Sequence, residues 1–167
     1  AVFHIDEENH PTITTTPRVT TTAVDQHCDI TVDLEKMVVR YYADLEVTDS
    51  TILQHRFRIP RQLKVESASL FQNGLPLETE VSVTRDGYLT VFVNQGLTGS
   101  QTFELRGVMA LDSRTTNIPV VTLDNADVLD ERIRLYYTEG VVLRVLKPQN
   151  VQLPATAMPY SVAHQGR

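Results

Sequence analysis

Tryptophan is absent from this chain, cysteine occurs once, and cationic side chains are outnumbered by anionic ones. The single Cys28 excludes an intrachain disulfide and a cysteine-based zinc cluster. The 15 Lys+Arg against 21 Asp+Glu give a net charge of -6. That balance argues against nucleic acid as a partner, because such binding depends on neutralising phosphates. No polybasic run is present for anionic lipid, and no apolar run approaches the roughly 20 residues of a transmembrane helix.

The common catalytic motifs are also missing. The chain contains no G-x-S-x-G, no phosphate-binding P-loop, no G-x-G-x-x-G and no H-E-x-x-H. Its five histidines are scattered without the spacing of zinc ligands; they are His4, His10, His27, His55 and His164. We therefore predict no enzyme, no catalytic residue and no cofactor, although two distant carboxylates can meet in any fold.

One segment could hold a metal ion. The stretch LDNADVLDE places Asp124, Asp127 and Asp130 close together, and calcium prefers carboxylate and carbonyl oxygens in flexible geometry. The other interpretation is that Asp and Asn form a turn here through their own side-chain hydrogen bonds. These three residues are a calcium candidate, and no other metal site is predicted.

Apolar and polar residues alternate through most of the chain between residues 18 and 147, with the period of two that is typical of half-buried strands. Turn signals separate the alternating runs, notably Asn73-Gly74, Asp86-Gly87, Gly96 to Gly99 and Glu139-Gly140. No amphipathic helix is evident, and residues 125–133 fit a turn that enters a strand. The pattern predicts an all-β fold, an antiparallel β-sandwich (Ig-like or jelly-roll-like) of about ten strands. A barrel is the alternative.

The two ends differ from this central region. Residues 1–17 are Thr-rich with two prolines and fit an extended arm or linker, while residues 148–167 fit a C-terminal strap or linker. We expect a β-sandwich domain over residues 18–147. Because the sequence starts at Ala1 without a methionine, we expect a mature product or a domain of a longer protein. The Thr-rich arm could supply or receive a strand.

Two doubled tyrosines, in RYYADL and LYYTEG, are the best candidates for a binding surface. Successive strand residues point to opposite faces, so Tyr41 and Tyr137 should enter the core. Tyr42 and Tyr136 should then face outward, each two residues after an arginine, Arg40 or Arg134. Arg56 and Arg58 extend this outward basic stripe. Such a surface suits a sugar ring or an extended partner, although arginine stems and tyrosine rings can also simply cover a sheet.

Four stretches of the chain, FRIPRQLKVESASL, TRDGYLTVFV, GLTGSQTFELRG and NIPVVTLDNADVLDERIRLY, carry a resemblance. Their succession resembles β-sandwich segments of large uncharacterised bacterial envelope-associated proteins. The resemblance covers roughly residues 18–147 and rests on the order of strands and turns, without a diagnostic motif. It implies an exported, non-enzymatic module, and it assigns no site residue.

These observations lead to three expectations about function. The first is a non-catalytic structural or interaction module of a larger exported or cell-envelope protein, whose partners are neighbouring proteins or flanking domains of the same chain. The second is a carbohydrate-binding module that uses the outward tyrosines and arginines to hold a glycan. The third is a capsid or fimbrial subunit that exchanges strands through its N-terminal arm.

Overall fold

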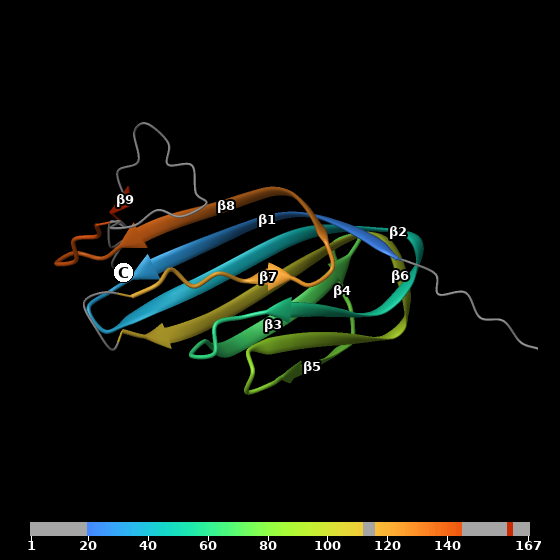
Figure 1. Cartoon of the computed structure of the whole chain (residues 1–167), viewed down its shortest axis with the longest axis horizontal. Helices are drawn as coiled ribbons and strands as arrows, with labels where there is room; N and C mark the ends of the chain where they lie inside the picture. The colour runs from blue at the N-terminus through green and yellow to red at the C-terminus, as the bar shows by residue number, and fades with distance from the viewer. Residues whose placement is uncertain (1–19, 112–115, 145–159, 162–167) are drawn as a thin grey trace, which may run out of the picture.

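The computed structural model describes residues 20–111, 116–144 and the backbone of 160–161, and strands dominate this part of the chain (Figure 1). They form one mixed sheet. The strands are β1 (Thr21–Val32), β2 (Lys36–Arg58), β3 (Lys64–Gln72), β4 (Leu75–Pro76), β5 (Thr79–Val83), β6 (Tyr88–Ala110), β7 (Thr122–Leu123), β8 (Asp127–Tyr137) and β9 (Tyr160–Ser161). The described residues include no helix long and apolar enough to cross a membrane.

Two strands of 23 residues each, β2 and β6, bend and so belong to two layers. Residues 37–48 of β2 pair with β1, and residues 36–47 pair with residues 99–110 of β6. Residues 54–58 of β2 pair instead with residues 88–92 of β6. The register shifts between Val47 and Ile52. Positive φ angles at Asp49 (70°) and Gly99 (78°) lie in this region and let the backbone turn. The sheet therefore folds back on itself.

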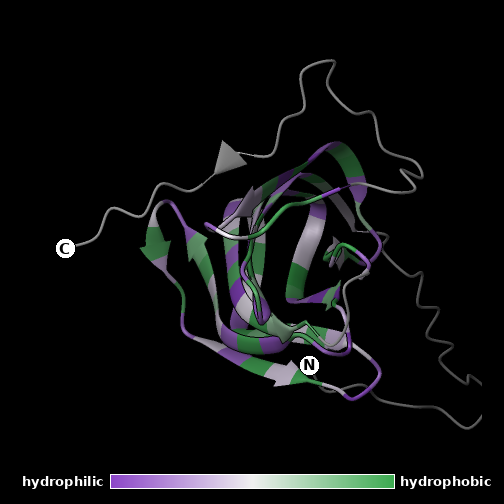
Figure 2. Cartoon of the chain, turned by 90° about the vertical axis from the view of Figure 1, so that its left-hand side faces the viewer, coloured by the Kyte–Doolittle hydropathy of each residue, from purple (hydrophilic) through white to green (hydrophobic). Residues whose placement is uncertain are grey.

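The result is a sandwich-like arrangement of two layers. We call the order β4-β3-β6-β2-β1-β8-β9 the long layer. The short layer contains β5, the N-terminal part of β6, the C-terminal part of β2, and β7. Figure 2 looks along the molecule and shows the sheet curled round its interior, with hydrophobic and hydrophilic residues alternating along the strands. This confirms the predicted all-β fold.

The core is built where the two halves of the bent strands face each other. Phe57 from the short layer stacks on Phe103 from the long layer, with ring centroids 4.1 Å apart and an interplanar angle of 17°. Tyr41 meets the edges of both rings at centroid distances of 6.1 and 6.2 Å. All three side chains are fully buried, and burying a side chain of this size contributes about 1.5–3 kcal/mol.

The prediction of a purely antiparallel sandwich with about ten strands is wrong in detail. β8 runs parallel to β1, and β9 runs parallel to β8. The described residues form nine strands. Two pairs of runs that the alternation predicted as separate strands, VVRYYADLEV with LQHRFRI and YLTVFVN with TFELRGVMAL, each belong to one strand. Gly96 and Gly99 lie within β6 at its bend instead of in a turn. Alternation alone does not distinguish a bent strand from two strands, or a parallel neighbour from an antiparallel one.

Other parts of the prediction are confirmed. Asn73 and Gly74 form the turn between β3 and β4 with φ angles of 53° and 76°. Gly87, with φ of 85°, closes the hairpin between β5 and β6, where the Thr84 N–H donates to the Tyr88 carbonyl at 2.8 Å. Residues 124–126 lead as a turn into β8. Two other runs were predicted as strands, and these predictions are wrong for most of their described residues: in IPVVTL only Thr122 and Leu123 are strand, and in VVLRVL residues 141–144 are not strand. The arm of residues 1–17 and most of 148–167 lie outside the described residues.

Candidate functional site

The outer face of the long layer carries most of the predicted site residues. Odd-numbered residues of β2 from Met37 to Val47 are buried, so the even-numbered Arg40 and Tyr42 point away from the core, as predicted. The facing residues of β1 on this surface are His27 and Asp29, and those of β8 are Arg132 and Arg134. The three arginine side chains are exposed, whereas His27, Asp29 and Tyr42 are half-buried.

A row of arginines crosses this face. The strand register places Arg134, Asp29, Arg40 and Arg106 side by side on β8, β1, β2 and β6. The Arg134 Nε donates to Asp29 Oδ1 at 2.6 Å, and the Arg106 Nε donates to Glu66 Oε2 at 3.1 Å. Arg40, between them, forms no ion pair with any described residue. Its side chain is exposed on this face.

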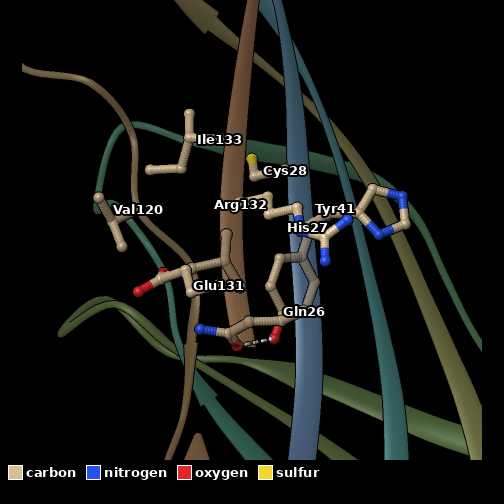
Figure 3. A pocket seen from close by; sticks show the side chains of 9 residues that line it. Gln26, His27, Cys28, Tyr41, Val120, Glu131, Arg132 and Ile133 are labelled. Carbon is tan, nitrogen blue, oxygen red and sulfur yellow. Dashed lines mark hydrogen bonds between the residues drawn. The ribbon is translucent and has the colours of Figure 1, made fainter. Parts of the chain in front are cut away.

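The next row contains an aromatic stack. The His27 and Tyr42 rings lie on neighbouring strands with centroids 4.8 Å apart and an interplanar angle of 17°. Figure 3 shows His27 and Cys28 on opposite sides of β1, which places His27 outside and Cys28 inside. Because His27 covers one face of the Tyr42 ring, Tyr42 is half-buried and can present at most its other face.

Tyr136 does not join this stack. Arg132 is the β8 residue in the row of Tyr42, and Tyr136 lies four residues further along β8. With strand spacings near 4.8 Å and a rise near 3.3 Å per residue, about 16 Å separate the two tyrosines. Tyr137 faces inward as predicted, opposite Val32, but it is only half-buried and not part of the core. It is less buried than predicted because β8 lies near the edge of the layer.

Acidic residues form a second band on the same face. The register places Asp130, Asp25 and Asp44 in one row, and the next row holds Asp127 and Glu46. The row of His27 and Tyr42 lies between this acidic band and the arginine row. The long layer thus has an acidic end and a basic end.

The calcium candidate is not supported by the arrangement of its residues. Asp124 lies beside Arg56, with 3.6 Å between its Oδ2 and the arginine Nε, and Asp130 pairs with Arg132. No group of three His, Cys, Asp or Glu within the described ranges is placed to hold a metal ion. Asp124 and Asn125 instead form the turn before β8, where Asn125 has a φ of 56°.

The short layer carries an arginine–tyrosine cluster that the sequence analysis did not find. The Arg56 guanidinium carbon lies 3.9 Å from the centroid of the Tyr88 ring, and the Arg58 Nη2 donates to the Tyr88 hydroxyl at 2.7 Å. The hydrogen bond holds the pKa of Arg58 above its ordinary value. Arg56 and Arg58 are exposed, in agreement with their predicted outward direction, but they do not extend the stripe of Arg40. β2 bends between Arg40 and Arg56 and places both residues on the other layer. The sequence feature that pointed to this cluster is Tyr88, which directly follows the Asp86-Gly87 turn. Tyr88 pairs with Arg58 across β6 and β2.

A narrow crevice opens between β1, β8 and residues 120–121 (Figure 3). The Tyr41 hydroxyl donates to Gln26 Oε1 at 2.7 Å, while the Gln26 Nε2 has no partner in the described part of the chain. The crevice is too narrow to admit a water molecule. Burial, aided by the nearby Asp29 and Glu131 carboxylates, raises the pKa of the Cys28 thiol to about 12. Burial likewise raises the pKa of Tyr41, so both groups stay protonated and neither is a nucleophile at neutral pH.

His55 is another polar side chain of the core. His55 is buried, and its Nε2 lies 2.7 Å from Gln101 Oε1. Burial lowers its pKa despite that hydrogen bond, so the ring is neutral at pH 7. A groove of about 400 Å³ lies beside the end of β6, and none of its lining side chains is titratable; they are Pro60, Gln62, Met109, Ala110, Thr116, Asn117, Ile118 and Pro119.

No known protein family and no curated protein matches the sequence. Among solved structures, the chain is similar to a point mutant of an M1 zinc metallopeptidase from Deinococcus radiodurans bound to a Tyr-Ser-Ala substrate. The TM-score is 0.42 and the identity 11%, over 60% of this chain and 23% of that chain. A second structure of the mutant aligns with a TM-score of 0.42 and 12% identity, over 59% and 23%. This chain spans less than a quarter of that peptidase, and a likeness of this degree carries no inference about activity.

Proposed function

We propose that this chain is a non-catalytic interaction module of a larger exported or cell-envelope protein. Its contact surface is the outer face of the long layer. The observation that carries the proposal is the ordered charge pattern of that face. A row of arginines and a band of carboxylates cross the same strands on either side of the row of His27 and Tyr42, and the register of β1, β2, β6 and β8 fixes their positions.

The pattern suits a protein partner for a physical reason. Complementary charges steer two surfaces together and fix their relative orientation, and they contribute more to specificity than to affinity. Rows held by a paired sheet need little reorganisation on binding, which lowers the entropic cost. Tyrosine and arginine are enriched among the residues that dominate interface energies. Tyr42 and Arg40 lie where the two bands meet and are the anchors of this surface.

The geometry supports a protein partner better than a glycan. A sugar platform needs open aromatic faces within the reach of one ring or of neighbouring rings. Tyr42 is covered on one face by His27, and Tyr136 lies two rows and two strands away. In contrast, the row of Arg134, Asp29, Arg40 and Arg106 carries a charged residue on each of four strands, and the row of Asp130, Asp25 and Asp44 does so on three. We therefore put the protein partner first, and glycan binding becomes an outcome of the test.

Site-specific photo-crosslinking tests the proposal. Tyr42 is replaced by benzoylphenylalanine in the natural full-length protein within its native cells, and Phe92, exposed on the short layer, is replaced as the matched control. We expect a protein crosslink from position 42 that is absent from position 92. It should disappear when Arg40→Glu and Arg134→Glu reverse two charges of the row. Charge reversal at Arg85, exposed in the β5–β6 turn, should leave it unchanged.

Three results would count against the proposal. Equal crosslinking from both positions would show that the face has no special role. A glycan-array signal that Tyr42→Ala abolishes would favour the carbohydrate module instead. Turnover of any substrate in a broad panel of hydrolase substrates, lost on substitution of a residue in this chain, would overturn the non-catalytic assignment.

A further inference from the structure

The strand β5 forms an open edge of the short layer. It pairs with β6 on one side and has no other strand partner in the described part of the chain. The hydrogen bond from the Thr84 N–H to the Tyr88 carbonyl continues this antiparallel ladder. Because hydrogen-bonded pairs alternate along such a ladder, the N–H and C=O groups of Glu80 and Ser82 point to β6. Those of Thr79, Val81 and Val83 point to the open edge.

Two valines of β5 show that the layer is incomplete at this edge. Val81 pairs with Val91 and Val83 with Leu89, and both partners are fully buried in the core. The valines therefore face the interior, yet they are 38% and 50% exposed. They are exposed because the layer ends at β5. One additional strand would cover their side chains and would also pair the free backbone groups.

The other long edges are protected against such pairing, and β5 is not. β3 has a register shift between Val65 and Ser67, with the exposed Glu66 in the bulge. In β8, four of the five residues from Asp130 to Arg134 are charged, and the fifth is Ile133. Bulges and charged side chains are the usual means of preventing edge-to-edge association. The only charge on β5 is Glu80, whose side chain is on the outer face.

We infer that β5 accepts a strand from a second copy of this chain, and that residues 12–16 are the donor. This stretch, TITTT, consists of five consecutive β-branched residues, which favour strands. It has the same length as β5. Pro17 follows it and ends the pairing, since proline has no N–H to donate. Ile13 and Thr15 would then face the interior beside Val81 and Val83. The donor lies outside the described residues, and the acceptor geometry carries the argument.

The connection between the arm and β1 is short. Thr20 lies directly before β1, and four peptide units between Thr16 and Thr20 span at most about 14 Å. β1 belongs to the long layer, whereas β5 ends the short layer. We assign the donor to a second copy, and the concentration dependence of the molar mass tests this assignment, because pairing within one copy would give a monomer at every concentration.

The inference predicts self-association that depends on β5 and on the arm. We would measure the molar mass of the whole chain by sedimentation equilibrium over a wide concentration range. Val81→Lys places an ammonium group on the interior side of the added strand and should weaken association at least about tenfold, equivalent to about 1.4 kcal/mol. Ser82→Lys adds the same charge to the outer side of the same strand and should leave association within about twofold.

The arm provides an independent test. Deletion of residues 1–17 should give a monomer, and Ile13→Asp should weaken association while Thr14→Asp does not. A peptide of residues 10–19 should bind the deleted protein, and Val81→Lys should abolish this binding. A chain that is monomeric at all concentrations, or oligomers that persist after deletion, would overturn the inference. Thermal unfolding of each variant shows whether it is folded. If Val81→Lys does not fold, the binding of the peptide to the deleted protein tests the inference instead.

Discussion

The buried pair of Tyr41 and Gln26 allows a sharp prediction about stability. Both side chains are buried, and the hydroxyl donates to Gln26 Oε1 at 2.7 Å. Tyr41→Phe removes that donor and leaves the whole Gln26 amide without a partner, because Nε2 already has none in the described residues. A buried polar group left unsatisfied costs about 1–3 kcal/mol. We expect Tyr41→Phe to lower the free energy of unfolding by that amount.

The double variant is the more informative one. Gln26→Met with Tyr41→Phe replaces both polar partners by apolar groups of similar shape, a change that is nearly neutral or stabilising. It also removes the unpartnered Nε2 from the crevice. The double variant should therefore be at least as stable as the parent, although Tyr41→Phe alone is less stable. Such non-additivity is expected for two residues in contact.

Urea unfolding is a suitable assay for this cycle. The midpoints of the parent, the two single variants and the double variant are compared at constant slope, so that a shift in midpoint reports stability. Tyr42→Phe is the matched control, because its side chain lies on the outer face, and it should change stability by less than about 0.5 kcal/mol. A double variant destabilised by the sum of the single effects would refute the reasoning. Packing, and not hydrogen-bond satisfaction, would then govern this site.

Three further predictions concern pH and packing. Burial lowers the pKa of His55 below 6.5, so the unfolded chain binds a proton at this residue more readily than the folded chain does. The free energy of unfolding should therefore fall as the pH drops below 6.5. Urea midpoints of the parent should fall more steeply in this range than those of His55→Gln. The raised pKa of Cys28 implies the opposite dependence at high pH. The free energy of unfolding should decline as the pH rises from 9.0 towards about 12, and Cys28→Val should reduce this decline. A thiol reagent should react with Cys28 only in the unfolded chain. Gly107→Ala should destabilise by about 1–3 kcal/mol in calorimetry, because the added Cβ would lie 2.9 Å from the Lys64 carbonyl oxygen and 3.0 Å from the Leu63 side chain.

Much of the secondary structure follows from local pattern. Alternation in β1, β2 and β6 assigns inner and outer faces residue by residue, which is why Tyr41 is buried and Tyr42 is not. The turns at Asn73-Gly74 and Asp86-Gly87 follow from residues that accept positive φ. These properties depend on neighbours along the chain, so sequence reasoning finds them.

The candidate site was only partly predictable. Arg40, Tyr42 and Arg134 face outward on the long layer as expected, but Arg56 and Arg58 lie on the other layer with Tyr88. Which outward residues become neighbours depends on strand order and on the bend of β2, and period-two patterns contain no information about either. The arginine row exists because β8 pairs in parallel with β1, a pairing between residues about a hundred positions apart.

The sequence by itself determined that the described part of the chain is all-β, which face of β1, β2 and β6 is buried, and where the turns at Asn73-Gly74 and Asp86-Gly87 fall, because these depend on period-two hydrophobicity and on residues suited to positive φ. The tertiary structure decided that two long strands bend to serve both layers, that β8 returns parallel to β1, and that β5 ends its layer with two half-covered valines. These features arise from pairing and packing between distant segments. The physical reason is that the contacts which bring such segments together are set by the whole core, and neighbouring residues along the chain do not specify them.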